Sequence, residues 1–280
     1  MLATDLLVRE QTSEAKLDVA ISRAWANWPS AGAFHYRSRD VPYDIPEDQE
    51  VEVLRGFLAV SKQPPFFKRH PGAPRIPLPA AAAPDGQFPE VLLARRTHRE
   101  FAPVPVQLDT LATLLHYTFG VTGWLQTRVL GRLVHKTSPS AGARHPVEAY
   151  VAATRVNGLR PGLYHYATRS HELELLRPGN LRRLLAKWCA DQQYVAEAAA
   201  LVFLTGVLPR VSWKYRFDRA YRAVLLDAGH VGQTFCLAAT WLGLAPFCFA
   251  AFNDTAVENA LGVDGVNEVA LYVVGVGMPR

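Results

Sequence analysis

The alternation of apolar and polar residues predicts strands on both sides of a short loop in the middle of the chain. Residues 132–135 alternate polar and apolar side chains, and residues 147–151 alternate again. The stretch between them holds the small residues 138–142, SPSAG, and predicts a tight connection. Further strands are expected at residues 162–166, 172–176, 200–205 and 268–276, the first two as a hairpin.

Helical periodicity predicts four helices around these strands. Leucines recur on one face of residues 108–119, and Gly120 provides a C-terminal stop. Residues 88–96 and 181–199 are expected to be helical, the second with Asn180 as its N-cap. Residues 221–242 are apolar nearly all round, which is typical of a helix buried on every side, within the core or under a second subunit.

The chain is expected to divide into three parts. Residues 1–62 form a mostly helical N-terminal extension, and residues 63–88 form a Pro/Ala-rich, extended connector without packed structure. Residues 89–280 form the main domain. Because helices come first and are then mixed with strands, the predicted fold class is α+β with a central sheet.

Composition excludes several classes of protein. The formal net charge is +5 without a basic stripe interleaved with aromatics, so we expect no nucleic-acid partner. The three cysteines form no CxxC motif, so neither a metal site nor a disulfide framework is expected. We find no signal peptide and no apolar run of membrane-spanning length, so a cytoplasmic protein without membrane contact is expected.

The SPSAG loop admits three interpretations. It can be an ordinary turn, or a place where a flat ligand lies against the backbone and leaves no room for bulk. It also approaches the GxSxG motif of serine hydrolases, with Ser140 as nucleophile, His230 as base and Asp227 as acid. The first glycine of that motif is missing and a strand follows instead of a helix, which disfavours the hydrolase.

A cluster of cationic residues at 94–101, ARRTHREF, is a candidate phosphate site. Guanidinium groups bind phosphate through paired hydrogen bonds, and a hydroxyl adds one more. The alternative is a solvated, charged helix end. The cluster consists of Arg95, Arg96, Thr97 and Arg99.

These motifs together resemble the SagB-type dehydrogenase branch of the nitroreductase-like flavoproteins, the FMN-dependent azoline oxidases. The resemblance rests on ARRTHREF, on SPSAGARHPVEAY (138–150), on PGLYHY (161–166), on the segment 213–233 and on LGLAP (242–246). AFHYRSRD (33–40) is similar to an N-terminal signature of that branch. The resemblance therefore covers the chain from about residue 33 onward.

The resemblance implies a nitroreductase-like mixed central sheet with surrounding helices, and a homodimer with two FMN molecules in its interface, where the long central helix is buried. It implies that ARRTHREF grips the phosphate and ribityl chain and that the SPSAG backbone lies along the flavin ring. Ala250-Ala251-Phe252 stands where many relatives have Gly-Gly-Phe near flavin N5. The implied cofactor-binding residues are Arg95, Arg96, Thr97, Arg99, Pro139, Ser140, Ala141, Gly142, Gln233, Ala250 and Ala251.

Lys214 and Tyr215 match a Lys-Tyr pair that is catalytic in the azoline oxidases. An ammonium beside a phenol stabilises the phenolate, which can then remove a proton from carbon. The implied reaction converts a thiazoline or oxazoline into an azole in a modified peptide or small molecule, with O2 reoxidising the flavin and a cyclodehydratase as a further partner.

The sequence leaves alternative functions open. One is a different flavin oxidoreduction, such as NAD(P)H-dependent nitro or quinone reduction or desaturation of a metabolite. Another is a flavin-less scaffold that docks a peptide. In either case Lys214 and Tyr215 could be residues of an ordinary surface turn.

Overall fold

The structure is a computed structural model that describes residues 47–80 and 88–280, together with isolated positions between residues 12 and 34. The chain divides into two units: Met1–Ile45 with Arg216–Arg219, and Pro46–Tyr215 with Ala220–Arg280. Most of the predicted N-terminal extension lies outside the described residues. Helix α3, Glu47–Val60, belongs to the second unit, so the unit boundary falls before residue 62.

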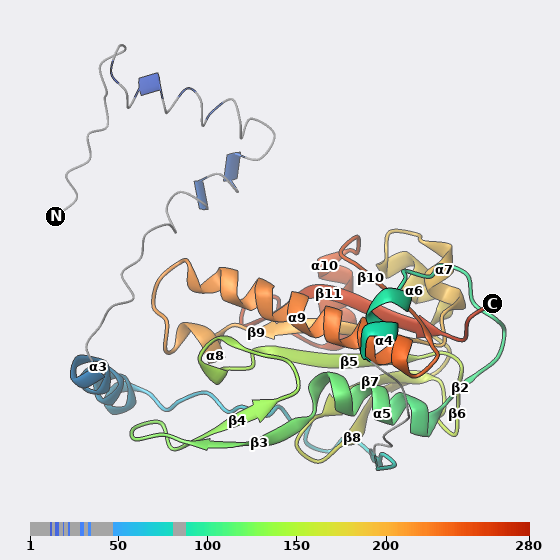
Figure 1. Ribbon diagram of the computed structural model, residues 1–280, viewed down its shortest axis with the longest axis horizontal. Coiled ribbons are helices and arrows are strands. Elements are labelled where there is room, and N and C mark those ends of the chain that lie inside the picture. The colour runs from blue at the N-terminus through green and yellow to red at the C-terminus, as the bar shows by residue number, and fades with distance from the viewer. Residues whose placement is uncertain are drawn as a thin grey trace. The chain divides into compact units, whose positions relative to one another are not determined.

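A seven-stranded sheet forms the centre of the second unit (Figure 1). Its strand order is β1-β8-β7-β5-β9-β11-β10, and each neighbouring pair runs antiparallel. Two small sheets accompany it, a parallel β2–β6 pair and an antiparallel β3–β4 hairpin. The strands of the main sheet are β1 Arg75–Pro77, β5 Val147–Ala153, β7 Gly162–Ala167, β8 Glu172–Pro178, β9 Ala200–Val207, β10 Ala245–Phe249 and β11 Glu268–Gly277. The others are β2 Val106–Gln107, β3 Val121–Gln126, β4 Arg132–Lys136 and β6 Val156–Asn157.

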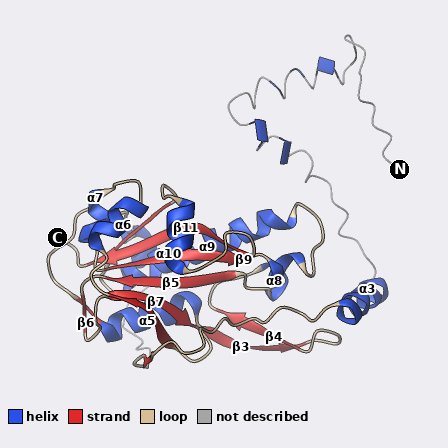
Figure 2. Cartoon of the chain, turned by 180° about the vertical axis from the view of Figure 1, so that it is seen from behind, coloured by secondary structure: helices blue, strands red, loops and turns tan. Residues whose placement is uncertain are grey.

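Helices cover both faces of this sheet, which confirms the expected α+β fold. Alternate residues of β5 point to opposite sides, so Val151 joins one apolar cluster and Tyr150 the other. The first cluster packs against α5 (Leu108–Phe119) and α9 (Ala220–Trp241), and the second packs against α6 (Arg182–Trp188), α7 (Gln193–Glu197) and α10 (Asp254–Leu261). Figure 1 shows α9 in front of the sheet, whereas Figure 2, seen from behind, shows α10 in front.

The long predicted helix at residues 181–199 is wrong, because the chain forms α6 and α7 with a break between them. Ala190 and Asp191 at the break adopt φ values of 52° and 56°. This left-handed backbone cannot continue an α-helix. The N–H of Asp191 instead bonds to the carbonyl of Ala186 and closes the end of α6.

Within one chain, α9 is buried on one side only, which leaves the second of the two expected settings, burial under another subunit, as a prediction. Val224, Val231 and Phe235 are buried, but Tyr221, Leu225 and Leu226 on the other side are 42%, 45% and 61% exposed. Among the described residues, one face of α9 is therefore buried and an apolar face is exposed.

The predicted connector is also packed where it is described. Strand β1 pairs with β8, which makes it one edge of the main sheet. Further upstream, Lys68 pairs with Glu268 and Arg69 pairs with Glu172. The prolines remove donors without preventing an extended chain, so the segment can lie along the sheet at its edge. Residues 61–80 are called the strap below.

Across the described helices, no segment is both long and apolar enough to cross a membrane.

Candidate active site

The SPSAG loop leads into a tight 3-10 turn. Its small side chains allow a neighbouring tyrosine to pack against the backbone of this turn. The turn spans Ala141–Ala143, and Gly142 within it has φ 57°. Ala143 and His145 also adopt positive φ, of 51° and 45°. Non-glycine residues take this conformation at a cost, which is typical of functional sites.

Two polar groups hold this loop in place. The hydroxyl of Ser140 donates to Oδ2 of Asp227 at 2.5 Å and accepts from the N–H of His145 at 2.8 Å. Burial raises the pKa of Asp227 above its usual value. The contact corrects the serine-hydrolase alternative: Asp227 bonds Ser140 directly, whereas a triad requires a histidine between acid and nucleophile, and His230 is exposed.

Tyr215 lies against this loop. A Cβ added to Gly142 would stand 2.1 Å from the Tyr215 hydroxyl oxygen, so only glycine admits that hydroxyl here. Lys214 places its Nζ 5.3 Å from the centroid of the Tyr215 ring. The N–H groups of both residues bond to the carbonyl of Val211, so they extend the last turn of α8 (Pro209–Ser212). The structure thus joins the predicted Lys-Tyr pair to the predicted ring-binding loop.

A buried arginine was missed in the sequence. Arg144 is 1% exposed, donates through Nε to the carbonyl of Gly142, and stacks over Phe66 at 5.1 Å. Its Nη2 is buried and finds no acceptor among the described residues. Burial lowers the pKa of Arg144, and the electrostatic effect of the nearby Tyr215 phenol partly offsets this lowering. Because a buried donor without a partner is costly, this nitrogen suits a ligand acceptor at the loop.

Arg210 fixes the position of the Lys-Tyr pair relative to the loop. It is 3% exposed, forms an ion pair with Glu148 at 2.5 Å, and donates to the carbonyl of His145 at 2.9 Å. Its Nε donates to the carbonyl of Pro65 in the strap. Although burial opposes ionisation, the charge of Arg210 keeps the pKa of Glu148 below its usual value. One guanidinium therefore ties α8, the loop and the strap together.

A second cation lies behind the loop. Lys136 lines a small cavity with Ser140, His145 and Asp227. Burial lowers the pKa of Lys136 to about 8. Burial, reinforced by the Lys136 charge, also lowers the pKa of His145 to about 4, and His145 Nε2 bonds the carbonyl of Val134. His145 is thus a neutral structural residue near pH 7.

The ARRTHREF cluster lies elsewhere, at the end of α4 (Phe88–Ala94) and beside the edge strand β10. The N–H of His98 bonds to the carbonyl of Pro246. A hydrogen bond from Cys236 and the charges of Arg95 and Arg99 lower the pKa of the Cys248 thiol. Both arginines therefore lie near Cys248 of β10.

The remaining members of this cluster differ in their surroundings. Arg96 donates to the carbonyls of Leu93 and Arg95, and the side chain of Thr97 is exposed. The guanidinium of Arg99 also lies 5.7 Å from the centroid of the Tyr194 ring.

The last three predicted cofactor residues are not tied to the loop. Gln233 is exposed on α9, and Ala250 and Ala251 are exposed after β10. Neither alanine adopts positive φ. The backbone of Ala251 accepts a bond from Gln192 at 3.3 Å. Their roles in flavin binding stay predictions.

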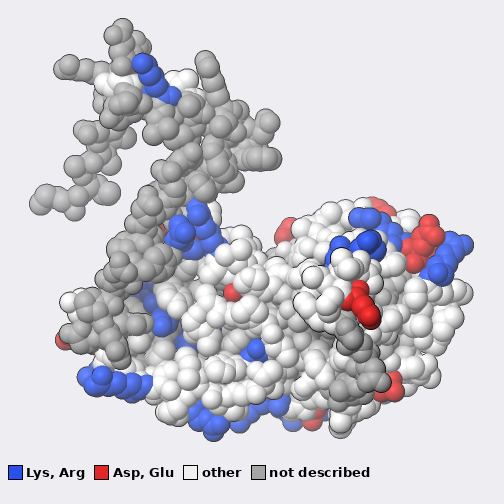
Figure 3. Space-filling model, in the orientation of Figure 1, with Lys and Arg blue, Asp and Glu red and all other residues white. Residues whose placement is uncertain are grey.

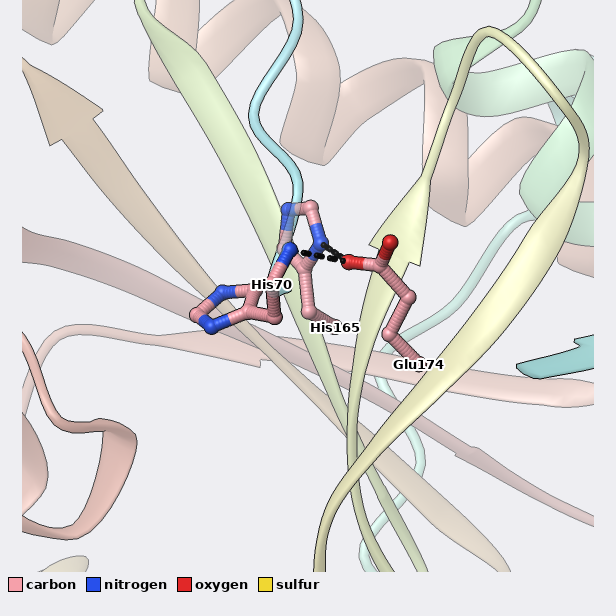
Figure 4. A group of neighbouring side chains, drawn as sticks. All are labelled: His70, His165 and Glu174. Atoms are coloured by element: carbon pink, nitrogen blue, oxygen red, sulfur yellow. Dashed lines mark hydrogen bonds and ion pairs between the residues drawn. The ribbon is translucent and has the colours of Figure 1, made fainter. Parts of the chain in front are cut away.

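A buried charge network links β5, β7 and β8, beginning at Glu148 near the start of β5. His165 faces a carboxylate with each ring nitrogen, Glu148 at 2.9 Å and Glu174 at 3.0 Å. His70 joins the group through its backbone N–H, which donates to Glu174 at 3.0 Å. Figure 4 shows the carboxylate of Glu174 facing His165, while the ring of His70 points away from that carboxylate. The three ligand atoms lie within 4.8 Å of one another, but the His70 ring points away from the Glu174 carboxylate (Figure 4), and the hydrogen bonds of His165 to two carboxylates account for this cluster without a metal.

Arg144, Lys136 and Arg210 escaped the sequence analysis for a common reason. Each is a single cation without a motif of its own, and only the fold brings its partners together. One signal was available: Glu148 interrupts the apolar strand 147–153, and a buried carboxylate requires a cationic partner.

Comparison with solved structures supports this fold. The chain matches a nitroreductase from Anabaena variabilis with a TM-score of 0.65 and 27% identity, over 86% of this chain and 49% of that one. It also matches the E. coli microcin synthetase McbBCD complex with truncated pro-MccB17 bound, with a TM-score of 0.56 and 19% identity, over 94% of this chain and 97% of that one. The second likeness concerns the fold alone.

Related sequences fall in the same group. MJ1384 of Methanocaldococcus jannaschii, which carries a nitroreductase name, is 31% identical over 67% of this chain and 89% of its own length. The trifolitoxin-processing protein TfxB of Rhizobium leguminosarum is 31% identical over 61% of this chain, which spans about half of TfxB. The microcin B17-processing protein McbC of E. coli is 25% identical over 47% of this chain and 50% of McbC. The sequence profile of the Nitroreductase family matches residues 92–278, and the chain therefore belongs to that family.

Proposed function

We propose that this protein binds FMN and oxidises a thiazoline or oxazoline ring of a modified peptide to the corresponding azole. The observation that carries the proposal is the contact of Tyr215 with Gly142. It puts a candidate proton acceptor against the loop whose small residues suit the flat face of a flavin. Relatives named for trifolitoxin and microcin processing support a peptide substrate.

The residues present fit FMN in two places. Arg95 and Arg99 both lie near Cys248 of β10, where they would hold the phosphate. At the loop, Gly142 and its neighbours leave the backbone accessible, and the unpartnered Nη2 of Arg144 would donate to the edge of the ring.

The two places lie apart along α9. On α9, Asp227 lies beside the loop, and Cys236 lies beside Cys248, near the arginines. These two residues are nine positions apart in the helix, which corresponds to roughly 13 Å along its axis. A homodimer would bring the loop of one chain to the arginines of the other. The exposed apolar face of α9 supports this arrangement, with Leu225 and Leu226 as its centre.

Bound FMN would supply the two-electron acceptor that the oxidation requires. Tyr215 would take the Cα proton of the azoline at its Oη, and the Lys214 ammonium would stabilise the phenolate that accepts it. Arg210 would keep both residues in register with the loop through Glu148 and the carbonyl of His145. A cyclodehydratase, which would make the azoline, is the partner that this reaction requires.

The proposal is tested by mixing the protein anaerobically with either a thiazoline-containing peptide or NADPH as the reductant of its flavin. The purified protein should be yellow, and a thiazoline-containing peptide should bleach its flavin in a single turnover while an azole forms, as followed by absorbance and mass spectrometry. NADPH should bleach it much more slowly. Bleaching by NADPH with none by the azoline would make the protein a nitro- or quinone-reductase type enzyme, and a colourless protein would refute FMN binding.

A further inference from the structure

The β3–β4 hairpin is a two-stranded ribbon with open edges. Among the described residues, Val121–Gln126 and Arg132–Lys136 pair only with each other. A two-stranded ribbon is marginally stable on its own, and its outer edges present unpaired N–H and C=O groups. Such an edge accepts a further extended strand through main-chain hydrogen bonds.

The hairpin carries positive charge, and neither it nor the strap that contacts it contains an acidic residue. In the strap, Lys68 and Arg69 are paired with Glu268 and Glu172, so among these described residues the unpaired charge lies on the hairpin. No Asp or Glu occurs between Asp109 and Glu148, or between Glu52 and Asp85. Arg128 at the hairpin turn and Arg132 on β4 are both exposed. In Figure 3, Lys and Arg gather along the lower edge of the view, where Figure 1 draws the hairpin. The charge therefore favours an acidic partner.

Apolar and aromatic side chains accompany this charge. Trp124 and Leu125 on β3 are 39% and 46% exposed. The ring of Trp124 meets Phe67 of the strap edge-on at 6.1 Å, and Arg132 stacks over it at 4.8 Å. We call Phe67, Trp124, Leu125, Arg128 and Arg132 the hairpin surface. Its mixture of apolar and cationic groups suits a strand whose acidic side chains alternate with apolar ones.

The hairpin leads directly to the candidate active site. Strand β4 ends at Lys136, and the SPSAG loop begins at Ser138. The turn at the far end is held by Thr127, whose N–H and hydroxyl both donate to the carbonyl of Gly131. A strand laid along the hairpin would therefore run from an ordered tip toward Tyr215.

We propose that the hairpin surface docks an acidic, extended segment of the peptide substrate by strand addition, remote from the ring that reacts. This inference rests on the proposed function, because it names a second part of the same substrate. Main-chain bonds would supply affinity without a fixed sequence, and the arginines would select negative charge.

Binding of a model peptide tests the docking without turnover. The probe is a fluorescein-labelled twelve-residue peptide of alternating Glu and Val, followed by fluorescence anisotropy on the full chain. The double variant Arg128→Glu/Arg132→Glu should weaken binding at least about tenfold. The matched control Arg177→Glu/Arg183→Glu, which changes two exposed arginines by the same charge, should stay within about twofold. The same peptide N-methylated at every second residue should bind poorly, because it lacks half of the edge donors.

Several results would overturn the proposal. Equal losses in the two double variants would mean general electrostatic attraction, and unchanged binding of the N-methylated peptide would exclude strand addition. If the Arg128→Glu/Arg132→Glu variant changes its oligomeric state, the occupant of the hairpin surface is a second copy of the chain. If oligouridylate binds at the same arginines more tightly than the peptide, the occupant is a nucleic acid. A failed peptide assay beside intact oxidation of a small azoline would sink the docking alone, whereas peptide binding without azoline oxidation would sink the proposed function alone.

Discussion

At the scale of single residues, the contact between Gly142 and Tyr215 is the feature most open to test. Gly142→Ala should lose azoline oxidation about tenfold or more, because the new Cβ would displace the tyrosine hydroxyl by an ångström or more. The control is Gly243→Ala, at φ 70° with nothing within 4 Å. Both variants should lose about 1–2 kcal/mol of unfolding free energy through left-handed strain. Equal activities in the two variants would remove Tyr215 from the site.

Lys136 makes a prediction about pH. The pKa of this lysine is about 8 in the folded protein, whereas the ordinary pKa of a lysine, which applies to the unfolded chain, is 10.5. Between these values the unfolded chain binds more protons than the folded one, so the stability contribution of this group rises with pH. The unfolding free energy of the wild type, relative to Lys136→Met, should therefore increase from about pH 8 to about pH 10.5 in urea titrations. A difference that is flat over this range would show that Lys136 is solvated like a surface lysine.

At the scale of elements, the periodicity of apolar residues predicted most helices and strands. It did not predict the left-handed break between α6 and α7 or the pairing of β1 at the edge of the sheet. The helix at residues 108–119 and the hairpin at 162–176 were expected, and α5, β7 and β8 confirm them. The break at Ala190 has no glycine or proline to announce it, and the tertiary setting imposes it. The strap pairs with β8 through backbone groups, which side-chain patterns do not record.

The segment after α4 carries the prediction on the cofactor phosphate. Arg95→Ala with Arg99→Ala should lower FMN affinity at least tenfold, since each charge-assisted hydrogen bond contributes about 1.5–3 kcal/mol. The affinity is measured by titrating the flavin-free protein with FMN and following flavin fluorescence. Circular dichroism shows whether the fold is intact. Arg177→Ala with Arg183→Ala is the control for lost positive charge. Full affinity in the Arg95/Arg99 variant would move the phosphate elsewhere.

At the scale of the whole molecule, the uncovered face of α9 predicts a second chain. Leu225→Asp with Leu226→Asp should yield a monomer that has lost FMN, because the charges would be buried in the interface. Val231 is unsuitable for this test, since it is 7% exposed within the core of its own chain. Val266→Asp, at a 72% exposed apolar position outside α9, is the matched control. Light scattering that finds a yellow monomer would contradict the shared site.

The candidate site was predictable only in part. The motifs proposed the loop and the Lys-Tyr pair as candidates, because each is contiguous in sequence. Their contact depends on α8, whose position is set by the buried pair Arg210–Glu148, and those residues are 62 positions apart in the chain (210 minus 148). Long-range pairing of this kind leaves no local pattern, so the geometry needed the fold.

The central claim is that Tyr215, assisted by Lys214, removes the proton while bound flavin accepts the electrons. The measurement is single-turnover bleaching of the flavin by a thiazoline peptide in the wild type, Tyr215→Phe, Lys214→Ala and the double variant. Each variant should keep FMN and lose rate by roughly 10²–10⁴-fold, and the double variant should be little worse than either single one. Dithionite should reduce all four at the same rate, because it needs no base. Bleaching of Tyr215→Phe at the wild-type rate would contradict the account and reduce the pair to a structural role.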